Sequence, residues 1–293
     1  MVDITGIRGE TLEVDYSITN SGDFGSVEDV ELLIDGNVEY VDQDVMITDS
    51  AAGTLYWQAD SIGTYTATVS IAGVSDQITV QVDLDKPDNT VAHYDASQLS
   101  LTDGDTVSVW PDEQGDNDLD IQTGSPTYVE SGINGNPAIA FNGDGLEVTG
   151  LSVTQPNTTY VVFEYQGGFD RGRVLSGVSE RQLAVWAWDD DDKWRTWAGN
   201  RLNGSNDLGI QQMTAVFDGG NSIIREDGVE TAVGDAGTRD LGGLSVGYDA
   251  SGYNNGEPRD YADAYVSEIV VVNSGSVDLD FENQLLEKWG ITA

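Results

Sequence analysis

The chain has 293 residues and a formal net charge of −40, because 52 Asp and Glu face only 12 Lys and Arg. Proteins bind nucleic acids and anionic membrane surfaces through clustered basic residues. With so few basic residues, neither is an expected partner of this chain. Cysteine is absent and His93 is the only histidine, which excludes disulfides, thiol chemistry and zinc sites with two histidines.

Residues 1–84 are predicted to form short strands separated by turns. Residues 11–18 alternate apolar and polar side chains, which is typical of a strand with one solvent-facing side. Asp35 and Gly36 follow an apolar run and predict a hairpin. Further strands are expected at residues 54–57, 63–71 and 77–82. Because no helical period separates these runs, the segment is predicted to be a small β-sandwich.

Four stretches of this segment resemble the immunoglobulin-like cell-adhesion modules called CARDB domains. They are residues 9–14, 18–23, 34–36 and 63–69. The resemblance implies an immunoglobulin-like sandwich that acts as a spacer or an adhesion unit.

The strand pattern breaks at residues 83–90, where Pro87 and its polar neighbours predict a short extended linker. We therefore expect a first domain at 1–84, a linker at 85–90 and a second domain at 91–293.

The second domain is predicted to consist of strands with tight turns between them. Its apolar blocks lie at residues 107–112, 132–144, 158–164, 213–219, 223–229, 244–248 and 264–272. Their order and spacing resemble the concanavalin A-like (laminin-G-like) jelly roll. The expected fold class is thus all-β: an immunoglobulin-like β-sandwich followed by a larger jelly-roll sandwich with a short C-terminal helix.

That helix is predicted from a stripe of apolar residues near the C-terminus. Phe281, Leu285 and Trp289 recur at intervals of four, the spacing of one helix face. Asp278 or Asp280 can cap its beginning, and Gly290 ends it.

No catalytic residues are predicted. Glycoside hydrolases need two carboxyl groups across one cleft, and members with the jelly-roll fold commonly carry them as Glu-x-Asp-x-x-Glu. The sequence contains no such motif. His93, beside Tyr94 and Asp95 on the first strand of the domain, is interpreted as structural.

The densest aromatic region surrounds an acidic hairpin tip at residues 189–192. A Trp face can stack on a sugar ring while a neighbouring carboxylate accepts hydrogen bonds from its hydroxyls. The candidate glycan-binding residues are Trp186, Trp188, Trp194 and Trp197, with Tyr248 and Tyr253 on a second acidic loop. The alternative is that some of these Trp residues fill the space between the sheets.

The same two loops are candidates for Ca²⁺ or Mg²⁺, since both ions prefer oxygen ligands. The candidate ligands are Asp189, Asp190, Asp191, Asp192, Asp249 and Asp263. The alternative is that these are solvated acidic loops without a metal.

The acidity extends along the whole chain, and only three of the 12 basic residues are Lys. This composition resembles that of proteins from extreme halophiles. At about 1 M salt the Debye length is roughly 3 Å, which screens most of the self-repulsion of so charged a surface. The sequence therefore predicts a protein adapted to high salt.

The jelly-roll blocks also resemble domains of phage tail fibres, virion appendages and prokaryotic surface proteins. The first residues have no basic and apolar leader pattern, and no apolar run approaches the roughly 18 residues of a spanning helix. These features favour a virion surface protein of a virus of halophilic archaea, a capsid turret, spike or tail fibre that binds host glycans or a glycoprotein.

Such an appendage is expected to form a homo-oligomer, a trimer or pentamer, and to contact other virion proteins. One alternative is a secreted or cell-surface adhesin of a halophilic archaeon. The other is a polysaccharide-active enzyme or its carbohydrate-binding module.

Overall fold

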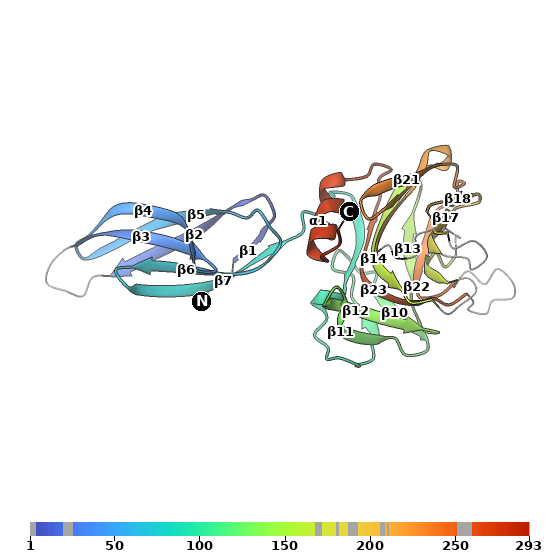
Figure 1. Ribbon diagram of the computed structural model, residues 1–293, viewed down its shortest axis with the longest axis horizontal. Helices are drawn as coiled ribbons and strands as arrows, with labels where there is room; N and C mark the ends of the chain where they lie inside the picture. The colour runs from blue at the N-terminus through green and yellow to red at the C-terminus, as the bar shows by residue number, and fades with distance from the viewer. Residues whose placement is uncertain are drawn as a thin grey trace. The chain divides into compact units, whose positions relative to one another are not determined.

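The computed structural model describes residues 4–19, 26–167, 172–179, 182–186, 193–205, 209, 211–250 and 260–292. The chain divides into two compact units, residues 1–85 and 86–293 (Figure 1). Each unit has its own hydrophobic core. The division falls inside the expected linker. Strands dominate both units, which confirms the all-β fold class.

The first unit is a sandwich of a five-stranded sheet, with the order β1-β7-β6-β3-β4, and a two-stranded sheet, β2-β5. Its strands are β1 (Ile4–Ile7), β2 (Thr11–Thr19), β3 (Ser26–Ile34), β4 (Asn37–Ile47), β5 (Ser50–Gln58), β6 (Gly63–Ile71) and β7 (Val74–Asp83). Strand β1 runs parallel to β7, and the other pairs are antiparallel.

Local sequence explains the strands of this unit. In β2 the buried residues Leu12 and Val14 alternate with exposed Glu13, so one face of the strand packs on the core. The predicted hairpin is confirmed between β3 and β4, where Asp35 (φ 48°) and Gly36 (φ 85°) both adopt the left-handed conformation. Two such residues form the tight turn whose twist matches the flanking strands.

The second unit consists of two large sheets with the core between them. One sheet has the order β18-β17-β16-β15-β22-β13-β10-β9, and the other has the order β11-β12-β23-β14-β19-β20-β21 with β8 also paired to β23.

The strands of the first of these sheets are β9 (Val109–Trp110), β10 (Leu119–Thr123), β13 (Gly145–Val153), β15 (Arg173–Ser176), β16 (Leu183–Trp186), β17 (Arg195–Trp197), β18 (Arg201–Asn203) and β22 (Leu241–Val246). Those of the second are β8 (Thr90–Asp95), β11 (Thr127–Ile133), β12 (Asn136–Asn142), β14 (Asn157–Tyr165), β19 (Gln212–Phe217), β20 (Ser222–Glu226), β21 (Val229–Gly234) and β23 (Asp263–Val272). Two short 3₁₀ turns, Ala96–Gln98 and Gly219–Asn221, complete the unit.

The predicted C-terminal helix is confirmed as α1 (Leu279–Lys288). The Asp278 carboxylate caps it by accepting hydrogen bonds from the backbone N–H groups of Asp280 and Phe281. Phe281 is buried and contacts Tyr160 of β14 edge to face, with ring centroids 5.1 Å apart. The helix therefore packs on the sheet that contains β14. Within the described ranges, no helix has the length and hydrophobicity needed to span a membrane.

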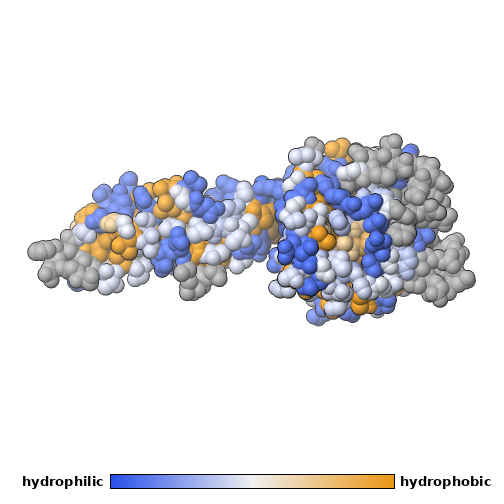
Figure 2. All heavy atoms as spheres, turned by 60° about the horizontal axis from the view of Figure 1, so that its bottom comes forward, coloured by the Kyte–Doolittle hydropathy of each residue, from blue (hydrophilic) through white to orange (hydrophobic). Residues whose placement is uncertain are grey.

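The surface agrees with the composition. Figure 2 shows hydrophilic residues over much of the visible face, with hydrophobic residues in separate smaller patches.

Candidate functional site

The predicted aromatic site belongs to one end of the sheet that contains β15 to β18. Strand β16 pairs antiparallel with β17, with Leu183 opposite Trp197 and Trp186 opposite Arg195. The expected hairpin therefore exists, but its connection lies outside the described residues. The candidate residues Trp188 and Asp189–192, and the side chain of Trp186, therefore lie outside the described part of the chain as well.

Trp194 is a core residue. Its side chain is fully buried and lies edge to face against Phe163 and Tyr165, at centroid distances of 4.9 and 5.5 Å. Both partners belong to β14 of the opposite sheet, so the Trp194 ring fills the space between the two sheets. This corrects its selection as a glycan-binding residue, because a buried ring has no face on which a sugar can stack.

Trp197 lies differently, although it is only three residues away. It is half-buried, and the guanidinium of Arg239 lies 4.8 Å from the centroid of its ring. This is the geometry of a cation–π contact, which holds the ring in place and covers one of its faces. Among the selected Trp residues with described side chains, only Trp197 is partly open to solvent.

Tyr248 is also buried, which corrects its selection as an exposed residue of the second acidic loop. Its hydroxyl donates a hydrogen bond to the Glu147 carboxylate, and its ring stacks on Tyr261 at 6.1 Å. Burial, followed by the bond to Glu147 and its charge, raises the pKa of Tyr248 far above the ordinary value. Tyr253 lies outside the described residues.

The candidate metal ligand Asp249 is buried, with a carboxylate oxygen 3.9 Å from Nε of Arg173. Arg173 also donates a hydrogen bond to Asp260 through Nη2, at 3.1 Å. A cation of the protein thus already faces Asp249. Asp263 is half-buried in β23, and the described residues include no cluster of metal-ligating groups that contains either of these two aspartates.

The one group of potential metal ligands in the described part of the chain is His93, Asp95 and Glu268. All three are buried beneath the end of α1. Nζ of Lys288 lies among them and donates hydrogen bonds to Asp95 at 2.7 Å and to Glu268 at 2.8 Å. Because an ammonium already fills this position, the cluster is an ionic network rather than a vacant metal site.

Two further groups contact Glu268 in this network. His93 Nε2 lies 2.7 Å from one oxygen of Glu268, and the Trp289 indole N–H donates to the other. Burial opposes ionisation of Glu268, but Lys288 and His93 outweigh it and lower the pKa of the carboxyl to about 2. The network therefore holds the last turn of α1 on strands β8 and β23. Its members come from three separate segments, residues 93–95, 268 and 288–289, and no local sequence motif predicted their contact.

No protein-family model and no curated protein sequence matches the chain. Among solved structures, domain 4 of the extracellular GH43 arabinanase AbnA from Geobacillus stearothermophilus, in complex with arabinotriose, is 15% identical with a TM-score of 0.49; the match covers 67% of this chain and 98% of that domain. Trypanosoma rangeli sialidase in complex with sialic acid is 11% identical with a TM-score of 0.41, over 94% of this chain and 53% of the sialidase.

A protein from Bacteroides ovatus ATCC 8483, whose assignment as carbohydrate-binding is itself provisional, is 11% identical with a TM-score of 0.39, over 99% of this chain and 84% of that protein. This chain spans about half the length of the sialidase that it matches. At these identities and TM-scores, the activities and ligands of the three proteins are not assigned to this chain.

Proposed function

We propose that this chain is a non-enzymatic virion structural protein of a virus of halophilic archaea. It belongs to a capsid turret, spike or tail fibre and attaches to glycans or a glycoprotein of the host surface through its second unit. In this proposal the first unit serves as a stalk or docking domain. The appendage is a homo-oligomer, a trimer or pentamer, on the virion surface.

The observation that carries the attachment function is the position of Trp197. Its ring stays partly open to solvent at the end of a sheet, while Arg239 fixes it in place. A ring held in one orientation loses little conformational freedom when a sugar stacks on it. The acidic side chains of the chain supply acceptors for sugar hydroxyls.

The high-salt setting is supported by the net charge of −40. Both sandwiches contain compact apolar cores, so the charge is carried by a folded protein whose surface is strongly acidic. Molar salt screens the repulsion between such charges.

The attachment function is tested with the labelled full-length chain in molar KCl, added to cells of halophilic archaea. We expect Trp197→Ala to reduce binding at least about tenfold, because losing an aromatic hot spot costs about 2 kcal/mol or more. The control is Tyr265→Ala, which removes a half-buried aromatic residue from β23 of the other sheet. Equal binding by wild type and Trp197→Ala would contradict this site, and the absence of the chain from purified virions probed with antibody would contradict the virion role.

A further inference from the structure

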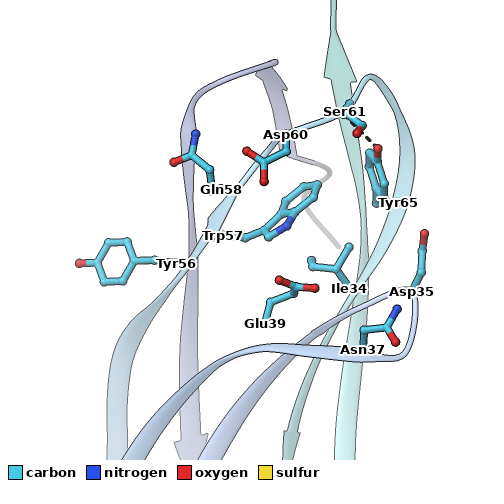
Figure 3. A pocket seen from close by; sticks show the side chains of 10 residues that line it. All are labelled: Ile34, Asp35, Asn37, Glu39, Tyr56, Trp57, Gln58, Asp60, Ser61 and Tyr65. Atoms are coloured by element: carbon cyan, nitrogen blue, oxygen red, sulfur yellow. Dashed lines mark hydrogen bonds between the residues drawn. The ribbon is translucent and has the colours of Figure 1, made fainter. Parts of the chain in front are cut away.

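The first unit contains a pocket of about 400 Å³ that the sequence did not indicate (Figure 3). The pocket lies where three segments meet: the β3–β4 hairpin, the end of β5 and the connection that leads into β6. Its volume falls within the range typical of pockets for small molecules. All of its lining residues belong to the first unit, so any ligand here binds independently of Trp197.

Trp57 forms the apolar side of the pocket. It is only 9% exposed, and its ring contacts Tyr65 edge to face at a centroid distance of 4.9 Å. The Tyr65 hydroxyl donates a hydrogen bond to the backbone oxygen of Ser61 at 3.0 Å, which positions the second ring. The two aromatic residues therefore form a rigid wall.

The indole N–H of Trp57 has no hydrogen-bond acceptor among the residues that the structure describes. In Figure 3 the nitrogen edge of this ring points to the side of the pocket where Glu39 and Ile34 lie. The nitrogen is not among the fully buried polar atoms that lack a partner, so it keeps access to the pocket although the side chain as a whole is buried. The Trp57 N–H can therefore donate a hydrogen bond to a ligand inside the pocket.

Two carboxylates of the lining are available to a ligand. Neither Glu39 nor Asp60 uses its carboxylate in a hydrogen bond or ion pair within the described ranges. Asp35, by contrast, accepts the backbone N–H of Thr66 at 2.8 Å.

The Gln58 amide is engaged on both sides, since it donates to the Gly9 carbonyl at 2.6 Å and accepts from the Thr11 hydroxyl at 2.9 Å. The pocket therefore offers one unused N–H donor and two unused carboxylate acceptors.

We propose that this pocket binds a neutral sugar residue, one hydroxyl of which accepts a hydrogen bond from the Trp57 indole and donates one to the Glu39 carboxylate. A hydroxyl both donates and accepts, as this pair of groups requires. An ammonium, a guanidinium or a metal ion cannot accept the indole hydrogen bond. An anionic sugar is repelled by the carboxylates.

The salt dependence of the affinity distinguishes neutral ligands from cationic ones in solution. The affinity for a neutral sugar should be nearly the same at a lower and at a higher KCl concentration. A cationic ligand, in contrast, loses affinity as salt screens its attraction to the carboxylates.

The test is a titration of the full chain in molar KCl, followed by NMR of its ¹⁵N-labelled tryptophan indoles. The probes are the methyl glycosides of glucose, galactose, mannose and N-acetylglucosamine. The Trp57 signal is identified as the one that disappears in Trp57→Phe, a variant that keeps a smaller aromatic ring and removes the indole N–H. We expect at least one glycoside to shift the Trp57 signal to saturation.

Glu39→Gln then tests the acceptor. We expect it to weaken this binding about tenfold, which corresponds to about 1.4 kcal/mol. Glu28→Gln makes the same charge change near the start of β3, at a residue that neither lines the pocket nor pairs with a lining residue, and should leave the affinity unchanged. Thermal melting of each variant confirms that it is folded. If Trp57→Phe unfolds, isothermal titration calorimetry still measures the change of affinity in Glu39→Gln and in its control.

Three results would overturn the proposal. The first is that no glycoside shifts the Trp57 signal. The second is that methylammonium or CaCl₂ shifts it in a Glu39-dependent way while the glycosides do not. The third is that glucuronic acid binds as tightly as the neutral sugars.

Discussion

Nζ of Lys288 lies 2.8 Å from Oε2 of Glu268 and thereby joins the last turn of α1 to the central part of β23. Glu268 is buried, and the same ammonium also bonds Asp95 of β8. Together with the ion pair between Glu282 of α1 and Arg225 of β20, this contact connects the C-terminal helix to the sheet, and it supports the first prediction.

Removing the Lys288 charge should strongly destabilise the second unit. We expect Lys288→Met to lower the free energy of unfolding by about 3 kcal/mol or more, because it leaves two buried carboxylates without their cation. Lys193→Met is the matched control, since it removes the same charge next to β17 and outside this network. Denaturant unfolding in molar KCl measures both variants, and similar losses would show that net charge rather than the network is responsible.

Glu268 should also contribute to the acid sensitivity of the protein. Its pKa is lowered in the folded state to about 2 from an ordinary value of 4.5. A carboxyl group with a lowered pKa stabilises the fold above the ordinary value, and that contribution is lost as the pH falls towards the folded value. Stability should therefore decrease between about pH 4.5 and 2 by less in Glu268→Gln than in the wild type. Circular dichroism measures the stability of both proteins across this pH range. Equal losses of stability in the two proteins would contradict this prediction.

The two neighbouring tryptophans should respond differently to truncation. Trp194→Ala is expected to cost about 3 to 5 kcal/mol of stability, because it leaves a large cavity against Phe163 and Tyr165. Trp197→Ala should cost clearly less, since its ring is only half-buried. Melting temperatures of the two variants in molar KCl make the comparison, and equal losses would mean that Trp197 is also a core residue.

Folding should depend on salt. When molar KCl is dialysed to about 0.1 M, the Debye length grows from roughly 3 to 10 Å and the repulsion within a chain of net charge −40 is no longer screened. We expect the melting temperature to fall markedly, as measured by circular dichroism. The same melting temperature at both salt concentrations would contradict adaptation to high salt.

Proteolysis should separate the two units. Residues 84–89 lie between β7 and β8 outside any strand, and the compact units divide at residue 85. We expect the earliest cut of a limited digestion in this segment and a stable fragment that contains residues 91–293. Mass spectrometry identifies the fragments, and earlier cuts within either core would contradict two independently folded units.

The sequence by itself determined the fold class, the β3–β4 hairpin and helix α1. The signals for these features are local: a period-two alternation in β2, the Asp35–Gly36 pair, and the Asp278 cap before an apolar stripe. Each depends on residues a few positions apart, whose pattern can be recognised without knowledge of the tertiary contacts.

Only the tertiary structure decided which aromatic residues face solvent and which polar groups meet. Alternation along a strand tells which residues share a face, but it does not tell which face the opposite sheet will cover. Trp194 is therefore buried against β14, while Trp197 remains partly open. Likewise, Lys288 meets Glu268, and Trp57 shares a pocket with Glu39, because packing brings together segments that carry no common motif.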